Sequence, residues 1–213
     1  MTGLGGDSGR AAVLAVLKVS RETEARLDGF AALVAKWNPA INLVSRKSLP
    51  EIWARHILDS AQVFDLAPEG ARHWADLGAG GGFPGIVVAI LAAERAPGLR
   101  VTLVESDQRK AAFLREAIRA TGVNASVCAE RIETLNPLMA DVLSARALAP
   151  LGRLLDFAER HLAPGGVAIF PKGATHGAEL AESLERWRFS VQKHPSRTGT
   201  DAVLLCIGDI ARA

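Results

Sequence analysis

The feature that most constrains the fold is the segment ADLGAGGGFPG at residues 75–85, which lies between two apolar runs. Its glycines are Gly78, Gly80, Gly81, Gly82 and Gly85. We expect a strand to end at Leu77 and a helix to begin near Pro84, so that the glycines form the turn between them. Such a turn lies at the carboxyl edge of a parallel sheet, where backbone N–H groups face an open crevice. The segment therefore predicts a ligand site in an α/β fold.

Short apolar runs alternate with helical segments from Trp74 onward. This alternation is typical of βαβ units around a parallel sheet that is buried on both faces. Strands are predicted at residues 73–77, 101–105, 125–129, 141–145, 166–170, 190–194 and 202–207. Helices are predicted near residues 85–95, 108–121, 150–162 and 176–187, with a break at Gly165-Gly166. We assign residues 73–208 to this α/β domain.

The part of the chain before the sheet shows only helical patterns. Residues 10–72 form a predicted N-terminal helical extension, and residues 1–9 are expected to be a disordered tail. Apolar residues at helical spacing through Trp37 predict a helix that ends at Asn38-Pro39, because the residue before a proline is disfavoured in the α region.

A second helix is predicted after a short link. Ser48 and Glu51 have the spacing of a capping box, and the apolar pattern that follows runs toward Leu66. The tryptophans of the two helical stretches, Trp37 and Trp53, could stack on a nucleic-acid base, but their apolar surroundings favour a place in the core.

Composition excludes a membrane protein. Hydrophobic residues make up 49% and charged residues 23% of the chain, as in an ordinary soluble protein. No apolar run approaches the ~18 residues of a membrane helix. The N-terminus lacks a basic region followed by an apolar one, so it does not resemble a secretory signal. We therefore expect a cytoplasmic protein with no membrane partner.

Neither the cysteines nor the total charge identifies a function. Cys128 and Cys206 lack the spacing of a zinc site, so we expect partly apolar, buried thiols and no metal. A net charge of +2 is too small to indicate nucleic-acid binding. Basic clusters do occur, at Ser45–Lys47 and in the acid-free segment Arg186–Arg197. Without another indication of RNA, solvated surfaces are the favoured interpretation of both.

Two ligands compete for the glycine-rich turn, the pyrophosphate of a dinucleotide and S-adenosylmethionine. Residues 80–85 match the G-x-G-x-x-G pattern, which is weak evidence by itself. Asp76 would repel a pyrophosphate, whereas it could hold the ammonium group of the methionine moiety. Pro84 removes an N–H donor that a pyrophosphate would need. Both residues favour S-adenosylmethionine, with Gly78 and Gly80 allowing the cofactor to approach the backbone.

The next two strands supply further candidate contacts. Glu105 ends its predicted strand beside the turn and is positioned for a ribose diol, although a solvated glutamate is the alternative. Ile132 and Glu133 follow the third strand and are candidates for the adenine. The assignment of Glu133 is weaker, because acidic residues are common at helix starts for dipole reasons.

The segment SARALAP after the fourth strand points to the acceptor. It contains neither the N/D-P-P-Y/F motif of amine methyltransferases nor a Pro-Cys nucleophile. A ring nitrogen such as guanine N7 already presents a lone pair, so its methylation needs no general base. Orientation alone can contribute about 7–11 kcal/mol. Arg146 is the candidate that aligns cofactor or base, and a buried arginine paired with acids of the sheet is the alternative.

Several segments together resemble one known family. NPAINLVSRKS, RHILDS, ADLGAGGGFPGIVVAI, VESDQRKAAFLRE, AERIE, SARALAPL and PKG occur in the order and spacing of the bacterial ribosomal RNA small-subunit methyltransferase G family, also called GidB. The resemblance implies a Rossmann-like, class I S-adenosylmethionine-dependent methyltransferase fold with an N-terminal helical extension. It also implies methyl transfer to N7 of a guanosine in the decoding-region loop of 16S rRNA.

The resemblance also assigns individual residues. It implies cofactor contacts at Gly78, Phe83, Ile132, Glu133 and Arg146, and it places Asn42, Arg55, His56 and Asp59 in the helical motifs and Lys172 in PKG. With 16S rRNA or the small ribosomal subunit as the implied partner, Arg46, Lys47, Arg55 and Lys172 become candidates for phosphate contacts. We expect a monomer.

Two other functions stay open at this point. One is a ribosome-associated RNA-binding protein whose cofactor pocket is vestigial, and intact Asp76, Gly78, Gly80 and Glu105 argue against it. The other is a nicotinamide-dependent oxidoreductase, which is supported only by the embedded G-x-G-x-x-G pattern.

Overall fold

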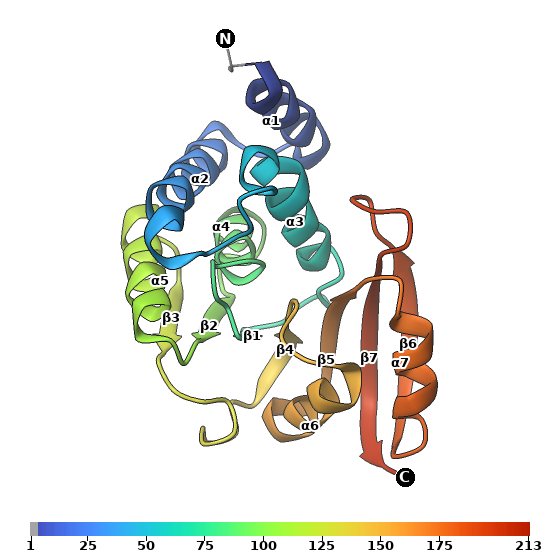
Figure 1. Ribbon diagram of the computed structural model, residues 1–213. Helices are drawn as coiled ribbons and strands as arrows, with labels where there is room; N and C mark the ends of the chain where they lie inside the picture. Colours follow the sequence, from blue (N-terminus) through green and yellow to red (C-terminus); the bar gives the residue numbers. More distant parts are fainter. Residues whose placement is uncertain (1–3) are drawn as a thin grey trace.

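A seven-stranded sheet forms the centre of the protein (Figure 1), in the order β3-β2-β1-β4-β5-β7-β6. The computed structural model describes residues 4–213, with side chains from residue 9 onward. The strands are β1 (His73–Leu77), β2 (Arg100–Val104), β3 (Ala125–Cys128), β4 (Ala140–Ser144), β5 (Leu162–Lys172), β6 (Trp187–Pro195) and β7 (Val203–Arg212). β7 is antiparallel to β5 and β6, and the other neighbouring pairs are parallel. This topology confirms the predicted mostly parallel α/β sheet.

The predicted strands match the structure closely in the sheet interior and less well at its antiparallel edge. β1 has the predicted boundaries, and all of its residues are buried. β5 begins at Leu162, before the predicted break at Gly165-Gly166, and pairs with β4 through a register shift. β6 and β7 extend beyond their predicted ranges, because antiparallel pairing continues through exposed residues that no longer form an apolar run.

Helices cover both faces of the sheet. They are α4 (Gly85–Arg95), α5 (Gln108–Thr121), α6 (Leu151–His161) and α7 (His176–Ser183). α4 and α5 have the predicted boundaries, and α7 ends earlier than predicted. α4 and α5 share one apolar core with the N-terminal helices, whereas α6 and α7 contribute to a second core on the opposite face.

The N-terminal extension is helical, as predicted. It consists of α1 (Leu4–Leu17), α2 (Arg21–Ile41), the 3-10 turn η1 (Leu49–Glu51), the π-helix η2 (Trp53–Leu58) and α3 (Asp59–Phe64). The sequence predicts a disordered tail at residues 1–9. From Leu4 onward the structure has a helix there instead, because α1 already begins at this residue. Residues 1–3 lie outside the described part of the chain.

The prediction that α2 ends at Asn38-Pro39 is wrong. Pro39 lies in the last turn, where its missing N–H costs the helix a single hydrogen bond. α2 ends instead where Asn42 adopts a left-handed conformation with φ 49°, and its N–H donates to the Asn38 carbonyl oxygen. The side-chain oxygen of Asn38 accepts from the Val44 N–H at 2.9 Å, which fixes the direction in which the chain leaves the helix.

The predicted capping box at Ser48 and Glu51 does not form. The Ser48 backbone is in the α region, and its side chain makes no capping hydrogen bond. Its hydroxyl instead donates to the Ser45 carbonyl oxygen at 3.1 Å and lies 2.9 Å from His56 Nε2. The continuous helix expected here is therefore divided into η1, η2 and α3. A π-helical turn such as η2 is rare and often occurs at functional sites.

The extension and the sheet form one packed unit. Phe30 of α2 lies 5.1 Å from Phe83 and 6.5 Å from Phe113, measured between ring centroids. Trp53 is 7% exposed and belongs to the core, as favoured from the sequence. Trp37 is only partly buried and packs edge-on against Phe113 at 5.8 Å, at the margin of the same core. Among residues 4–213, no helix has the length and apolar character that a membrane span requires.

Candidate functional site

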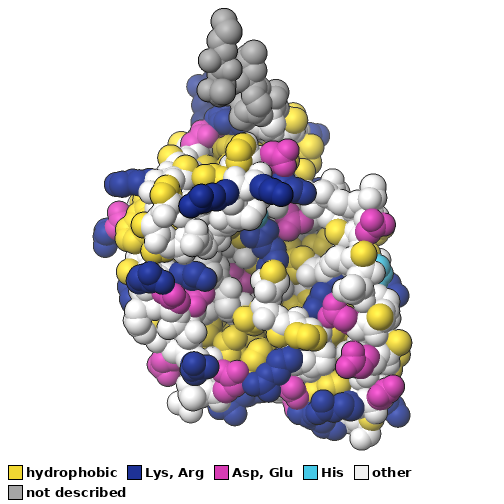
Figure 2. All heavy atoms as spheres, viewed as in Figure 1, with side chains coloured by type: hydrophobic (Ala, Val, Ile, Leu, Met, Phe, Trp, Pro, Cys, Tyr) yellow, Lys and Arg dark blue, Asp and Glu magenta, His cyan; other side chains and the backbone are white. Residues whose placement is uncertain are grey.

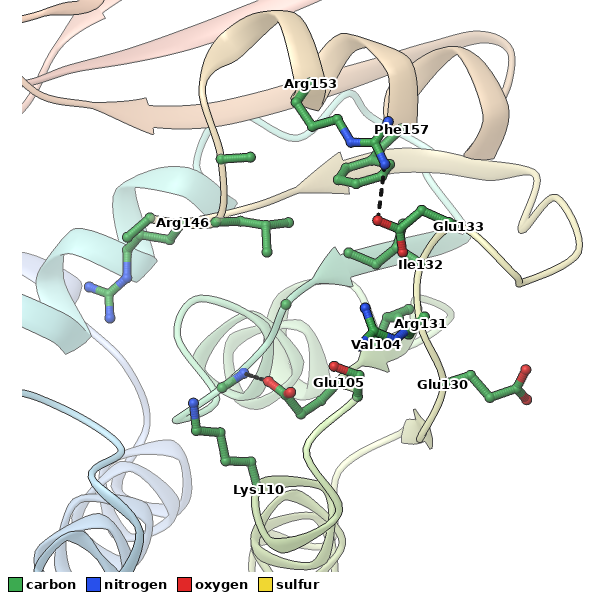
Figure 3. Close-up of a pocket in the computed structure, with 16 residues that line it drawn as sticks. Val104, Glu105, Lys110, Glu130, Arg131, Ile132, Glu133, Arg146, Arg153 and Phe157 are labelled. Carbon is green, nitrogen blue, oxygen red and sulfur yellow. Dashed lines mark hydrogen bonds and ion pairs between the residues drawn. The ribbon is translucent and has the colours of Figure 1, made fainter.

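A cleft of about 450 Å³ opens at the carboxyl ends of β1, β2 and β4 (Figure 3). Its size is within the usual range for a small-molecule site. The predicted cofactor residues that line it are Gly78, Gly80, Glu105, Ile132, Glu133 and Arg146. Two predicted residues, Asp76 and Phe83, do not line it. Among the described residues, no cluster of histidine, cysteine and acidic side chains is arranged to hold a metal ion.

Two positions of the glycine turn lack space for a side chain, because other segments pack closely against its backbone. Gly78 has a left-handed backbone with φ 65°, and a Cβ there would lie 2.7 Å from Leu148 Cδ1. A Cβ on Gly81 would lie 2.8 Å from the Leu43 carbonyl oxygen, in the link between α2 and η1. The turn therefore contacts both the loop after β4 and the N-terminal extension, and side chains at these positions would force them apart.

Glu105 fixes the turn to the end of β2. Its Oε2 accepts from the Gly80 N–H at 2.9 Å, and its Oε1 accepts from the Asp107 N–H at 2.8 Å. The side chain is 8% exposed and lines the cleft. Each carboxylate oxygen has a further lone pair, so Glu105 can still accept from the hydroxyl groups of a ligand.

Asp76 is a structural residue beneath the cleft, which corrects the expected contact with an ammonium group. It is completely buried, and its carboxylate accepts from the Gly85 N–H at 3.0 Å and from the Ser144 hydroxyl at 2.7 Å. Burial raises the pKa of Asp76 to about 7. The turn at Pro84 directs the first N–H of α4 onto this carboxylate, so Asp76 joins β1, β4 and α4 instead of facing the ligand.

Phe83 also lies behind the cleft, which corrects its predicted contact with the cofactor. Its ring is 4% exposed and packs 5.1 Å from Phe30 and 5.0 Å from the His56 ring, between centroids. The guanidinium carbon of Arg146 lies 5.3 Å from the centroid of the same ring. Phe83 therefore connects the extension to Arg146.

Arg146 lies between the cleft and a neighbouring cavity of about 360 Å³, which we call the side pocket. Its Nη1 lies 3.4 Å from Asp59 Oδ2, and its side chain is 21% exposed. Burial lowers the pKa of Arg146, and the Asp59 carboxylate opposes that shift. The alternative interpretation from the sequence is a buried arginine paired with acids of the sheet. Arg146 is indeed paired with an acid, but that acid, Asp59, belongs to α3 and not to the sheet. In Figure 3 Arg146 extends away from the other labelled residues, toward the pale cyan helix.

Ile132 and Glu133 lie on the loop after β3. The Ile132 carbonyl oxygen accepts from His161 Nε2 at 3.0 Å, which leaves its second lone pair, the N–H and the side chain for a ligand. Glu133 pairs with Arg153 of α6 at 3.0 Å (Figure 3), and its pKa is lowered by its own backbone N–H and by Arg153. Arg153 also lies 4.6 Å above the centroid of the Phe157 ring.

Sequence reasoning missed Arg153 and Phe157, which both line the cleft. One signal was present. Arg153 lies in the first turn of α6, where the helix dipole disfavours a cation, and such a residue needs a partner from elsewhere. The partner, Glu133, is 20 residues earlier in the chain, and no local pattern identifies it.

Four of the predicted RNA-binding residues, Asn42, Arg46, Lys47 and Arg55, are exposed. Three lie on the link after α2, whose Leu43 contacts the glycine turn, and Arg55 lies on η2. Arg55 makes one exposed ion pair with Glu51, at 3.5 Å. Figure 2 shows Lys and Arg side chains in a row across the upper part of this face, above a hollow.

Two other predicted RNA-binding residues are largely buried and contact groups of the protein, although Lys172 also lines the side pocket. Burial lowers the pKa of His56 to about 4, so its ring is neutral at pH 7, and Nε2 lies 2.9 Å from Ser48 Oγ. Lys172 has a side chain that is 9% exposed, and its Nζ donates to the Ala149 carbonyl oxygen at 3.0 Å and to Glu179 Oε2 at 2.7 Å. Both residues hold parts of the protein together.

Comparison with known proteins identifies the family. The sequence model of the GidB family, described as rRNA small subunit methyltransferase G, matches residues 23–202. The chain is 57% identical to the ribosomal RNA small subunit methyltransferase G of Ruegeria sp. (strain TM1040), over 92% of this chain and 95% of the relative. It is 49% identical to the protein of the same name from Bradyrhizobium sp. (strain ORS 278), over 96% and 93% of the two chains.

Solved structures show the same fold at low sequence identity. A cofactor-bound protein from MTB superposes with a TM-score of 0.60 at 17% identity, over 98% of this chain and 99% of that one. A predicted O-methyltransferase from Agrobacterium tumefaciens superposes with a TM-score of 0.54 at 20% identity, over 72% and 80%. With the match of its sequence over most of its length, this chain belongs to the GidB family of rRNA small subunit methyltransferases, which use S-adenosylmethionine.

Proposed function

We propose that this enzyme transfers the methyl group of S-adenosylmethionine to N7 of a guanosine in the decoding-region loop of 16S rRNA. The observation that carries the proposal is the position of Arg146, which lines both the cleft and the side pocket. A base in the side pocket would therefore meet the cofactor at this residue. The family assignment supports the rRNA substrate and removes the nicotinamide-dependent alternative.

The residues of the cleft suit S-adenosylmethionine. Gly78 and Gly80 line the cleft with backbone alone, and Glu105 offers a carboxylate to the ribose hydroxyls. Ile132 and Glu133 remain the candidates for the adenine. The bound cofactor supplies a methyl group on a sulfonium, which makes that carbon electrophilic. The residues of the protein bind and orient the two reactants.

The proposed reaction needs no general base. The N7 lone pair forms the new N–CH₃ bond while the S–CH₃ bond breaks, and no proton leaves the base. Two carboxylates of the cleft lining already have partners in the protein, because Glu105 accepts from two backbone N–H groups and Glu133 pairs with Arg153. Alignment of nucleophile, methyl carbon and sulfur is the main contribution that the protein makes. Arg146 is the residue placed to provide it.

The exposed link after α2 is the proposed entry for RNA. Asn42, Arg46 and Lys47 are exposed on the link whose Leu43 contacts the glycine turn, and Arg55 is exposed on η2, in the same extension as Asp59 of the side pocket. An RNA loop with its base in the side pocket would run past them. Lysine and arginine at such a rim suit phosphate contacts, which position a nucleic acid without reading its sequence. We further propose that the protein works as a cytoplasmic monomer, which sedimentation at micromolar concentration would test.

The experiment is deletion of the gene followed by strand cleavage specific for 7-methylguanosine in 16S rRNA. We expect cleavage at the decoding-region loop in the parent and in a strain complemented with the wild-type gene, but not in the deletion strain. A methyl mark that survives deletion would show that another enzyme makes it. Calorimetry with S-adenosylmethionine separates the remaining alternative, because absence of binding would favour an RNA-binding protein with a vestigial pocket.

A further inference from the structure

The side pocket is a second cavity directly next to the cleft. It has about 360 Å³ and shares Arg146 and Ala147 with the cleft. Its walls include apolar groups from Leu154, Pro171 and Leu204, and these are suited to the flat faces of a nucleobase. Asp59 and Arg146 meet at one side of it, and the polar residues Lys172, Glu179 and Ser196 also line it, with Lys172 and Glu179 paired to each other. A planar, partly polar ligand therefore suits this cavity.

Arg146 brings unused hydrogen-bond donors to this boundary. A guanidinium group has five N–H donors. In the structure one of them reaches Asp59 Oδ2, at the long distance of 3.4 Å, and the face of the group rests on the Phe83 ring. The side chain is 21% exposed, so few water molecules can satisfy the other donors. An acceptor on a ligand would satisfy them.

Asp59 brings a fixed acceptor to the same boundary. Its Oδ1 accepts from Gln62 Nε2 at 2.9 Å and from Thr198 Oγ1 at 2.8 Å, which holds the carboxylate from two sides. Gln62 is held in turn, because its side-chain oxygen accepts from the Arg197 N–H at 2.9 Å. Oδ2 has only the distant Arg146 contact, so it keeps capacity for a donor on a ligand.

A donor and an acceptor side by side match the Watson–Crick edge of guanine. In guanine the O6 acceptor is adjacent to the N1–H donor, whereas adenine has an amino donor beside an N1 acceptor. In the orientation that points position 7 toward the cleft, Arg146 and Asp59 would meet matched groups on guanine and like groups on adenine. Uracil presents the same acceptor and donor as guanine but has no N7 to receive the methyl group. N7 lies on the other side of O6 from N1, so a base held in this way directs N7 past Arg146 toward the cleft.

We propose that the side pocket binds the target base of the RNA, with Arg146 donating to guanine O6 and the Asp59 carboxylate accepting from N1–H. This inference rests on the proposed function and specifies how the site selects guanine. Asp59 belongs to α3, so the N-terminal extension contributes directly to base selection. The sheet and its loops supply Arg146 and the apolar walls.

The test measures binding of mononucleotides to the full chain in the presence of S-adenosylhomocysteine, by saturation-transfer NMR. The probes are GMP, AMP and 1-methyl-GMP, and the last of these lacks the N1–H donor. We expect GMP to bind on the order of tenfold or more tightly than either of the others. Equal binding of the three nucleotides by the wild-type protein would overturn the inference, whatever the variants do.

Variants then assign the selection to Asp59. Asp59→Asn is expected to remove most of the preference for GMP over AMP and 1-methyl-GMP. Thr198→Val is the matched control, because it removes one supporting hydrogen bond but keeps the carboxylate, and it should retain the preference. Calorimetry with S-adenosylmethionine checks that both variants are folded. A folded Asp59→Asn protein with wild-type preference would overturn the role of Asp59.

Failure of the proposed function gives a different result. Small subunits isolated from the deletion strain are incubated with wild-type enzyme and S-adenosylmethionine, and the rRNA is analysed for 7-methylguanosine. If no 7-methylguanosine forms, the proposed function fails, and the base-pocket inference fails with it. If 7-methylguanosine forms while the three nucleotides bind equally, only the inference is wrong.

Discussion

At the scale of single residues, several side chains that the sequence suggests as ligand contacts are instead internal supports. Asp76 bonds to the backbone of α4, Phe83 packs between the extension and Arg146, and His56 is neutral against Phe83. Arg146 is the residue whose predicted role agrees best with its position. It is also bonded to Asp59, which is 87 residues away in the chain.

Substitution of Arg146 by lysine should lower kcat about 100-fold. The lysine keeps the charge but lacks the planar fork that can contact Asp59 and a base at the same time. Single-turnover methylation of small subunits from the deletion strain measures the effect. Arg26→Ala is the control, because Arg26 makes only a surface ion pair with Glu22 in α2. An Arg146→Lys enzyme with near-normal kcat would remove Arg146 from the reaction.

His56 should make folding stability depend on pH. Burial lowers its pKa from 6.5 to about 4, so the unfolded state binds more protons between these values. The contribution of His56 is therefore present above pH 6.5 and is lost as the pH falls toward 4. Relative to His56→Gln, the wild type should lose on the order of 2 kcal/mol of unfolding free energy over this range, as measured by urea unfolding.

Asp76 should make folding stability depend on pH in the opposite direction from His56. Its pKa is raised from 3.8 to about 7, so the folded state binds more protons than the unfolded state between these values. Its contribution is present below pH 3.8 and is lost as the pH rises through 7. Difference curves against Asp76→Asn should therefore slope in the other direction from those against His56→Gln. Slopes of the same sign would contradict one of the two assignments.

At the scale of elements, the loop after β4 is held by a clamp from β5 and α7. Lys172 of β5 donates to the Ala149 carbonyl oxygen, and Glu179 of α7 accepts from both Lys172 and the Leu151 N–H. The clamp fixes the segment that carries Arg146 and covers Gly78 with Leu148. This arrangement favours a positioning role for Lys172 of PKG, and its RNA contact stays a prediction.

Removal of the charge at Lys172 and at Lys47 should therefore have different effects on kcat and on RNA binding. Lys172→Met should lower kcat about tenfold and leave the salt dependence of RNA binding unchanged, because Lys172 is enclosed by the protein. Lys47→Met should weaken RNA binding and reduce the slope of log K against log salt by about 1, as expected for an exposed phosphate contact. Filter binding over a range of salt concentrations measures both. A reduced slope for Lys172→Met would restore its predicted RNA contact.

At the scale of the whole molecule, the extension and the methyltransferase sheet share one core. Figure 1 shows the blue-to-cyan N-terminal helices beside α4 and α5, and buried residues of both parts belong to the same apolar cluster. The extension reaches the site at Asp59, which contacts Arg146, and it also packs tightly on the glycine turn at Gly81, where a Cβ would lie 2.8 Å from the Leu43 carbonyl oxygen. The domain boundary at residue 72 therefore stays a prediction, and the apolar core contains residues from both sides of it.

A methyl group at Gly81 should disturb this contact. Gly81→Ala is expected to lower the unfolding free energy by about 1–3 kcal/mol, because the obstructing atom belongs to the backbone and cannot rotate away. Gly29→Ala is the matched control in α2, where nothing lies within 4 Å of the new Cβ. That substitution should raise the stability by about 0.5–1 kcal/mol through helix propensity. Thermal unfolding of both proteins measures the difference, and equal effects would contradict the contact.

The sequence alone determined the order of elements and the place of the cofactor site. Five glycines between an apolar strand and an apolar helix define a strand–turn–helix unit, because its conformation depends on residues adjacent in the chain. Only the tertiary structure decided which polar side chains face the ligand. Asp76, His56 and Lys172 are turned inward by partners such as Ser144, Ser48 and Glu179. Those partners come from other elements, and local patterns carry no information about contacts between residues that are distant in the chain.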